Sequence, residues 1–229
     1  MRIPMFIEFS GKNVAVIGGG GVGTSRAKKF VEAGAKVTIY SLEFSEELKI
    51  LEKEGKISLV KVDAKELNYE EVLKNYDLVV VAIGDLSLNE KIVEAARKNK
   101  TLVNLANDAV ATEIVIPFEG NVDGIRFAIT TEGKSGVVAR KVKEIFEEVL
   151  RNRKDIRCFL EVMDFIKKYM KENNIPIKTR MKVYPSLSSN KEFQNLVFEC
   201  RRDEAIEFAK NYVNKIIKEK IKLEKVIEF

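Results

Sequence analysis

Short apolar runs alternate with longer amphipathic stretches through the first hundred residues of the chain. The runs are typical of buried strands because they are rich in valine, isoleucine and leucine and end at glycine or polar residues. They cover residues 13–18, 36–40, 57–62, 77–84 and 101–106. Apolar positions at helical spacing predict helices over residues 22–33, 45–55 and 88–99. This alternation favours right-handed crossovers, so we predict an α/β fold whose parallel sheet is covered on both faces.

The pattern changes beyond residue 112. Residues 113–131 are typical of strand, turn and strand, with Gly120 and Gly124 bracketing the turn. Helices are then expected over residues 137–152, 156–173 and 200–220, around a polar, irregular stretch at residues 175–190. No linker rich in glycine, proline or serine separates the halves, so the second part is expected to be a small α-rich region continuous with the first.

The glycine-rich stretch VIGGGGVGTSRA contains a GxGxxG arrangement at Gly18, Gly20 and Gly23. It follows a predicted strand and opens a predicted helix, which is the context that makes this short motif informative. Gly18 permits a tight turn, Gly20 lets a pyrophosphate approach the backbone, and Gly23 lets helix and strand pack closely. Free N–H groups at the helix start then receive the negative charge. The stretch therefore predicts a dinucleotide-binding loop.

The second predicted strand ends without the acidic residue that usually holds the adenosine ribose. Tyr40 and Ser41 stand in that place, and the first acid is Glu43. This rule therefore does not decide between NAD and NADP. No arginine follows closely in the sequence to bind a 2′-phosphate, which favours NAD.

Composition narrows the chemistry. The chain has no histidine and two cysteines, Cys158 and Cys200, without CxxC spacing, so we expect reduced thiols and neither a metal site nor a serine triad. No apolar run approaches the ~18–20 residues that span a bilayer, and the N-terminus does not resemble a signal peptide, so a cytoplasmic location is the default expectation. The net charge of +5 suits an anionic ligand. Nucleic-acid binding is not expected, because acids interrupt the lysine-rich C-terminal stretch.

Five ordered stretches together resemble the precorrin-2 dehydrogenase family, the dehydrogenase and ferrochelatase module of siroheme synthase. They are IPMFIEFSGKNVAVIGGGGVGTSRAKKFVEAGAKVTI, SLEFSEEL, DLVVVAIGDLSLNEKI, LVNLANDAVATEIVIP and AITTEGKSGVVARKVKE. The resemblance covers residues 3 to about 150. The last eighty residues or so resemble the family only in being helical.

The resemblance implies an NAD-dependent oxidation of precorrin-2 to sirohydrochlorin in siroheme biosynthesis. Some members of the family also insert Fe²⁺, and the sequence leaves open whether this chain does so. The family architecture implies a Rossmann NAD-binding domain, a small β–α dimerisation region and a helical C-terminal region in a homodimer. These parts are expected over residues 1–112, 113–150 and 151–229.

The resemblance also implies roles for individual residues. Cofactor contacts are implied for Gly18, Gly20, Gly21, Val22, Gly23, Leu42, Glu43, Ala82 and Ile83. Substrate contacts are expected for Asn104, Asn107, Lys134 and Ser135. Lys134 and Ser135 have the chemistry to bind one of the eight carboxylates of a precorrin, but Ser135 equally suits a helix N-cap. One departure from the family is Gly136, where a proline is usual.

Asp108 is the candidate catalytic residue. It follows the fifth predicted strand, at the end of a sheet where α/β folds bind ligands, and its carboxylate could accept the proton released on dehydrogenation. The family carboxylate maps one place earlier, onto Asn107, so either Asp108 replaces it or the chain lacks that group. Asp108 also suits an Asx-turn, which would be a purely structural role. Asp85 and Asn89 fit either loop structure or substrate contacts.

Two other functions compete with the dehydrogenase. One is an NAD-sensing regulatory module of the kind attached to potassium transport systems, which binds nucleotide without catalysis. Such modules usually keep an acid at the end of the second strand, which this chain lacks. The other is an oxidoreductase for an unrelated small substrate, which would need a larger substrate domain than the final eighty residues or so provide.

Overall fold

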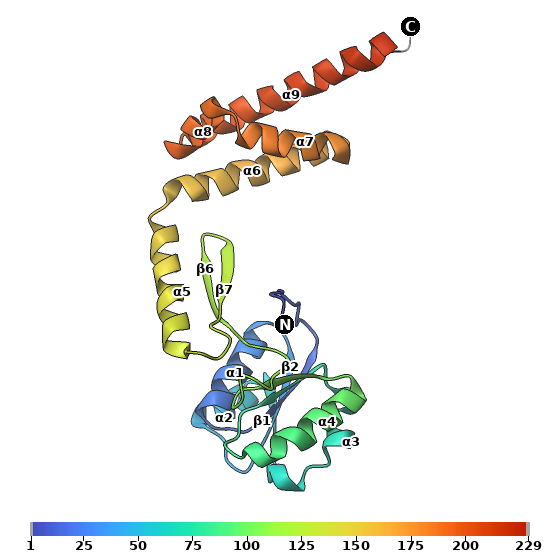
Figure 1. Ribbon diagram of the computed structural model, residues 1–229, viewed down its shortest axis with the longest axis vertical. Helices are drawn as coiled ribbons and strands as arrows, with labels where there is room; N and C mark the ends of the chain where they lie inside the picture. The colour runs from blue at the N-terminus through green and yellow to red at the C-terminus, as the bar shows by residue number, and fades with distance from the viewer. Residues whose placement is uncertain (1, 228–229) are drawn as a thin grey trace. The chain divides into compact units, whose positions relative to one another are not determined.

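The computed structural model describes residues 2–227, including the side chains of residues 2–218. The chain forms two compact units (Figure 1). Unit 1 comprises Met1–Phe118 and Thr130–Ala139, and unit 2 comprises Glu119–Ile129 and Arg140–Phe229. Compactness does not assign roles, so the division into a Rossmann domain, a dimerisation region and a helical region stays a prediction.

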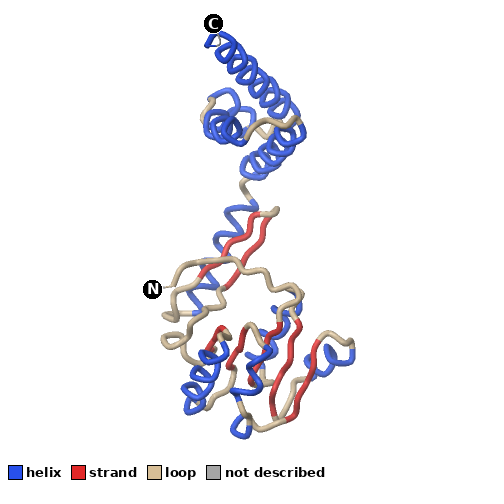
Figure 2. Tube along the Cα trace, turned by 90° about the vertical axis from the view of Figure 1, so that its right-hand side faces the viewer, coloured by secondary structure: helices blue, strands red, loops and turns tan. Residues whose placement is uncertain are grey.

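Unit 1 contains the predicted parallel sheet, whose strands are drawn in red in Figure 2. The strand order is β3-β2-β1-β4-β5, and every pairing is parallel. The strands are β1 (Asn13–Ile17), β2 (Lys36–Ser41), β3 (Ile57–Lys61), β4 (Leu78–Val81) and β5 (Leu102–Leu105). Each strand overlaps an apolar run of the sequence, and the α/β prediction is confirmed.

Strand β1 explains why the sheet is covered on both faces. Val14 and Val16 belong to one buried cluster and Ala15 and Ile17 to another, because successive side chains of a strand point to opposite faces. The first face packs against α1 (Gly21–Glu32) and α2 (Glu46–Lys53). The second packs against α3 (Tyr69–Val72), α4 (Asn89–Asn99) and the 3₁₀ turns η1 (Ala64–Glu66), η2 (Leu73–Asn75) and η3 (Leu86–Leu88). The sequence pattern had not predicted α3 or the 3₁₀ turns.

The predicted helix boundaries in unit 1 follow from capping. Leu48 N donates to Ser45 Oγ over 3.3 Å, so Ser45 is the N-cap of α2 as predicted. Gly34 and Gly55 follow the ends of α1 and α2 with φ of +78° and +71°. Glycine adopts this left-handed conformation without steric cost, which is why both helices stop there.

Unit 2 begins with a β-hairpin formed by β6 (Phe118–Val122) and β7 (Ile125–Ile129). Its turn consists of Asp123 and Gly124, with φ of +49° and +85°, as a tight two-residue hairpin loop requires. The prediction that Gly120 brackets this turn is wrong. Gly120 lies inside β6, where an added methyl group would lie 2.3 Å from the ring of Phe127. The aromatic ring packs over the strand and leaves no room for a side chain.

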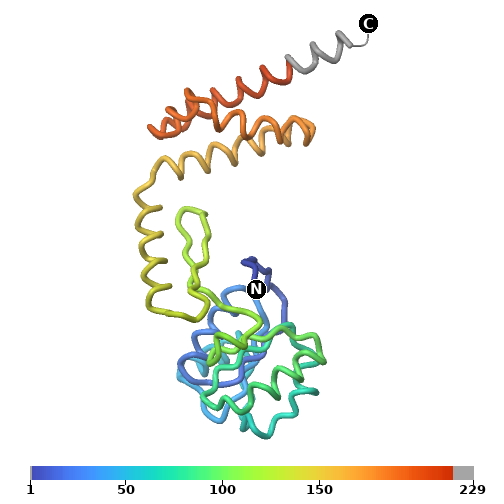
Figure 3. Tube along the Cα trace, viewed as in Figure 1, coloured from blue at the N-terminus to red at the C-terminus, as the bar shows by residue number. Residues whose placement is uncertain are grey.

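From α5 onward the rest of the described chain is mainly helical, and its course can be followed in Figure 3 by the colours from yellow to red. The helices are α5 (Gly136–Arg151), α6 (Lys154–Glu172), α7 (Ile177–Ser188), α8 (Lys191–Phe198) and α9 (Arg202–Ile227). Helices α6 to α9 share one core that includes Cys158, and Met163 packs against it. Both cysteines are free. Helices long and apolar enough to cross a membrane are absent from the described residues.

The prediction of an irregular stretch at residues 175–190 is wrong, because most of it forms α7. Pro185 lies inside this helix, where proline normally interrupts the hydrogen-bond ladder, and the stretch is mostly polar. Thr179, Val183 and Leu187, each four residues apart, are nevertheless buried against the core of unit 2. Tertiary packing of this stripe therefore outweighs the weak local preference for helix.

Candidate functional site

The carboxyl ends of the central strands meet at one edge of the sheet in unit 1. β1 and β4 are neighbours in the sheet but not in sequence, so the strand order reverses between them. Just beyond the strands, Gly18 N donates to Tyr40 O and Ala82 N donates to Ile17 O, each over 2.8 Å. Open α/β sheets bind ligands at such reversal points. The predicted cofactor residues follow β1, β2 and β4 and lie along this edge.

Two glycines of the loop after β1 are required by close packing. An added methyl group at Gly18, whose φ is +114°, would lie 2.5 Å from Ala82 O. One at Gly23 would lie 1.9 Å from Gly18 O, so helix α1 can approach the strand only without a side chain there. The tight turn and the close helix packing predicted for these two positions are both present.

Gly20 and Gly21 are different, because a methyl group at either would have no heavy atom within 4 Å. The protein's own packing does not require glycine here, and the space beside the backbone is open. Gly20 is the N-cap of α1 and offers no side-chain cap, and the first turn contains no acidic residue. The N–H groups of this turn are thus available to an anion, as the phosphate of a dinucleotide requires.

The end of β2 lies beside the same loop. An added methyl group at Gly19 would lie 2.3 Å from Glu43 O, which places residues 42 and 43 against the glycine loop. Leu42 and Glu43 are both exposed. Tyr40, which stands where the acid is missing, has a structural partner, since its hydroxyl is 2.9 Å from the Tyr76 hydroxyl in a partly buried pair. Burial and this hydrogen bond raise the pKa of Tyr40.

The loop after β4 is tied to the turn after β5 by two asparagines. Asn107 Nδ2 donates to Ile83 O over 2.9 Å. The side-chain amides of Asn107 and Asn89 also exchange hydrogen bonds of 3.2 Å in both directions. Asn107, where the family carboxylate was expected, is therefore engaged in holding two loops together. Asn89 has a structural partner, which accounts for its burial.

Asp108 stands beside this clamp and shapes its own turn. Its Oδ1 accepts hydrogen bonds from Val110 N over 2.9 Å and from Ala111 N over 3.0 Å. This is the geometry of an Asx-turn, which is the structural role that the sequence also suits at Asp108. None of the hydrogen bonds found among the described residues involves Oδ2, and the side chain is partly exposed. One carboxylate oxygen is thus engaged and the other faces no protein donor.

Asn104 and Asp85 have local structural partners. Asn104 Nδ2 donates to Ile114 O over 2.7 Å, while its Oδ1 is buried without a hydrogen-bond partner. Asn104 is 3% exposed, and its side chain is buried where β5, an outer strand of the sheet, meets the backbone of Ile114. Asp85 accepts from Ser87 N over 3.0 Å, and its hydrogen bonds with Ser87 lower the pKa of the carboxyl group.

The loop that carries Lys134 and Ser135 lies against the Asp108 turn. An added methyl group at Gly133, whose φ is +86°, would lie 2.3 Å from Ala109 Cβ. Ser135 Oγ accepts from Val138 N over 3.3 Å, so Ser135 caps the first turn of α5. Lys134 is exposed. The structure therefore brings Lys134 and the Asp108 turn to one side of unit 1.

Sequence reasoning missed Arg2, which fastens these two loops. Its guanidinium donates to Glu132 Oε2 over 2.6 Å and to the carbonyl oxygens of Ala109, Val110 and Thr112 over 3.0, 3.2 and 2.7 Å. The partners lie more than a hundred residues away in sequence, and no local pattern indicates such a contact. Among the described residues, no group of three or more His, Cys, Asp or Glu side chains could hold a metal ion.

Comparisons with known proteins agree with this geometry. Residues 5–118 match a family model provisionally described as NAD(P)-binding. A protein of Methanocaldococcus jannaschii with the provisional name precorrin-2 dehydrogenase is 33% identical over 84% of this chain and 92% of its own length. The precorrin-2 dehydrogenase of Priestia megaterium is 32% identical over 61% of this chain and 67% of its own. The solved structure of SirC, a precorrin-2 dehydrogenase, aligns with a TM-score of 0.56 at 24% identity over 95% of this chain and 100% of that one, which shows a common fold.

Proposed function

The chain belongs to the precorrin-2 dehydrogenase family, and from this premise we propose that it oxidises precorrin-2 to sirohydrochlorin with NAD⁺ as the hydride acceptor. The reaction is a step of siroheme biosynthesis. One observation carries the proposal: the hydrogen bond from Asn107 to Ile83 O holds the Asp108 turn against the loop after β4, which lies beside the glycine loop. A dinucleotide loop and a carboxylate thus share one edge of the sheet. Family membership does not favour the NAD-sensing alternative.

The residues of the edge fit a nicotinamide dinucleotide. Gly20 and Gly21 leave open space beside an uncapped helix start, which suits a pyrophosphate. Glu43 lies beside the glycine loop, where a carboxylate suits ribose hydroxyls and repels a 2′-phosphate, so we take NAD rather than NADP as the cofactor. When bound, the nicotinamide supplies the hydride acceptor that no amino-acid side chain provides.

The chain's own task is to position the tetrapyrrole and to accept the proton that leaves with the hydride. We assign proton acceptance to Asp108, whose Oδ1 is fixed by two backbone N–H groups while Oδ2 has no described donor. We assign the attraction of a substrate carboxylate to Lys134, an exposed cation in the loop beside the Asp108 turn. Arg2 holds the Asp108 turn and the loop that carries Lys134 together through Glu132 and three carbonyl oxygens. We therefore assign it the positioning of these loops rather than a contact with the substrate. Fe²⁺ insertion stays a prediction from the family resemblance.

We also propose a homodimer built through α5. Several apolar side chains of this helix are exposed by 46–80%, and they are Val137, Val138, Ile145, Phe146 and Val149. Ala139 is the residue of α5 that is buried within the chain. An amphipathic helix whose apolar side chains face solvent is typical of an interface between subunits. The cytoplasmic location stays a prediction.

The test is an anaerobic assay of NADH and sirohydrochlorin formation from precorrin-2 with the wild type and an Asp108→Asn variant. Asparagine keeps an oxygen for the two N–H donors and removes the charge, so the turn is expected to remain. We expect kcat to fall by about 10²–10⁴ while NAD binding and the melting temperature stay unchanged. Equal turnover in both proteins would make Asp108 a turn residue only. A wild type that binds NAD but makes no sirohydrochlorin would overturn the proposed function.

A further inference from the structure

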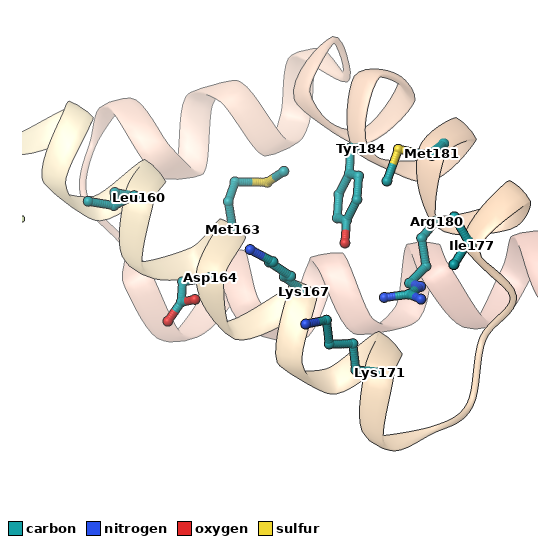
Figure 4. A pocket seen from close by; sticks show the side chains of 9 residues that line it. All are labelled: Leu160, Met163, Asp164, Lys167, Lys171, Ile177, Arg180, Met181 and Tyr184. Atoms are coloured by element: carbon teal, nitrogen blue, oxygen red, sulfur yellow. The ribbon is translucent and has the colours of Figure 1, made fainter. Parts of the chain in front are cut away.

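A groove of about 620 Å³ lies between α6 and α7 in unit 2, and none of its lining residues belongs to the sheet edge of unit 1 (Figure 4). We call it the α6–α7 groove; it is lined by Leu160, Met163, Asp164, Lys167, Lys171, Ile177, Arg180, Met181 and Tyr184. Its size is within the range of small-molecule sites, about 300–1,000 Å³. Nothing in the proposed dehydrogenation uses this groove.

The groove carries three cations that form no ion pair of 4.0 Å or less among the described residues. Lys167, Lys171 and Arg180 converge on it from the two helices (Figure 4). The one acidic side chain of the lining, Asp164, already pairs with Lys168, with Nζ and Oδ2 2.7 Å apart. The pKa of Asp164 is lowered first by that hydrogen bond and then by the nearby lysines. The lining therefore has an excess of positive charge.

Arg180 gives an independent sign that the groove suits an anion. Its Nε is buried and has no hydrogen-bond partner among the described residues. A buried donor without an acceptor costs roughly 1–3 kcal/mol, and more for a charged group. An anion in the groove would supply that acceptor, and carboxylates bind guanidinium groups in this way.

The remaining lining is apolar and exposed. Leu160, Ile177 and Met181 are exposed by 40%, 65% and 59%. Met163 and Tyr184 pack against the core of unit 2 and face the same groove. Apolar side chains, a phenol ring and thioether sulfurs suit a flat conjugated ring, since sulfur contacts with aromatic rings are favourable. The cations beside them suit acidic groups at the edge of such a ring.

We propose that the α6–α7 groove binds the carboxylate-bearing edge of a tetrapyrrole, with Lys167, Lys171 and Arg180 as the carboxylate partners. This inference rests on the proposed function, which supplies a ligand with eight carboxylates and a conjugated, apolar ring. The groove combines three cations with an apolar surface, and this combination also explains why hydrophobic side chains stay exposed in unit 2.

The experiment uses the full chain and uroporphyrin, an air-stable porphyrin with eight carboxylates, whose fluorescence reports binding. The test variant is Lys167→Glu/Lys171→Glu, since both lysines are exposed and their replacement leaves the core intact. The matched control is Lys178→Glu/Lys182→Glu, which changes the charge equally at exposed positions of α7 outside the groove. We expect the Kd to rise by about tenfold or more in the test variant and by less than about twofold in the control.

Equal weakening in both variants would overturn the proposal, because it would mean that net charge alone attracts the porphyrin. Displacement by heparin as effective as displacement by unlabelled porphyrin would also overturn it, in favour of a general polyanion surface. Arg180→Gln is the second variant, and an unchanged Kd there removes Arg180 from the site and contradicts the proposal. Failure of the proposed function appears separately, as absent NADH formation in the wild type whatever the porphyrin affinity.

Discussion

Two turns on one edge of the sheet differ in how many of their polar groups already have hydrogen-bond partners. The loop after β1 leaves its helix N–H groups without side-chain caps and keeps open space at Gly20 and Gly21. The turn after β5 does the reverse, because Asn107 bonds to Ile83 O and Asp108 bonds to two backbone N–H groups. The first turn has free donors, and the second has largely engaged ones.

The difference teaches that residue type alone does not identify a working group. A glycine loop has few internal alternatives, so its N–H groups remain for a ligand. Asparagine and aspartate readily bond to nearby backbone, so the same residues can build a turn, serve a substrate or do both. For Asp108 the distinction lies between its two oxygens, of which Oδ1 holds the turn and Oδ2 has no described donor.

Gly23→Ala is expected to have the largest effect on the first turn. The methyl group would lie 1.9 Å from Gly18 O, a backbone atom that cannot move without displacing the loop. We expect the free energy of unfolding to fall by about 3 kcal/mol, together with loss of measurable NAD binding. Urea denaturation and NADH fluorescence titration measure the two effects. A stable variant with normal affinity would show that the close helix–strand approach is not needed.

Gly20→Ala separates binding from stability and is expected to have a smaller effect. Its methyl group has open space, and its φ of −77° and ψ of −170° are accessible to alanine. Stability should therefore change by less than about 1 kcal/mol. The methyl group would occupy the space proposed for the pyrophosphate, so the Kd for NAD should rise by about tenfold or more. An unchanged Kd in the same titration would place the phosphate elsewhere.

Much of the fold could be predicted because its signals are local. The apolar runs of the sheet, the N-cap Ser45 and the glycines after α1 and α2 act over a few residues. Helix α7 could not be predicted, because its only support is the buried stripe of Thr179, Val183 and Leu187 against distant helices. The same limit explains Gly120, where the ring of Phe127 across the hairpin leaves no room for a side chain.

The candidate site divides in the same way. The glycine loop and the residues after β2 and β4 could be predicted from spacing, and the structure brings them to one edge. The clamp formed by Asn89 and Asn107 and the contacts of Arg2 join residues 18 to 130 positions apart. No periodicity encodes such pairs. The substrate contact expected for Asn104 stays a prediction, and its side chain is buried with a hydrogen bond to Ile114 O.

Asn107→Asp tests the second turn. The change would place a carboxylate where the family has one. It removes the N–H donor to Ile83 O, so a carboxylate oxygen and a carbonyl oxygen, both acceptors, would face each other. We expect a loss of about 1–3 kcal/mol in unfolding free energy at pH 7.

The pH dependence of that loss distinguishes a broken hydrogen bond from a general disturbance of the turn. Facing a carbonyl oxygen, the introduced carboxyl group should have a folded-state pKa above its unfolded value of about 3.9, because only its protonated form can donate. The variant should then keep its stability relative to the wild type below pH ~4, and it should lose that stability as the pH rises through the folded-state pKa. Asn107→Ala is the control, since it removes the same donor without a titratable group. Equal loss in both variants at pH 4 and pH 7 would mean that the link to Ile83 does not hold the two loops together.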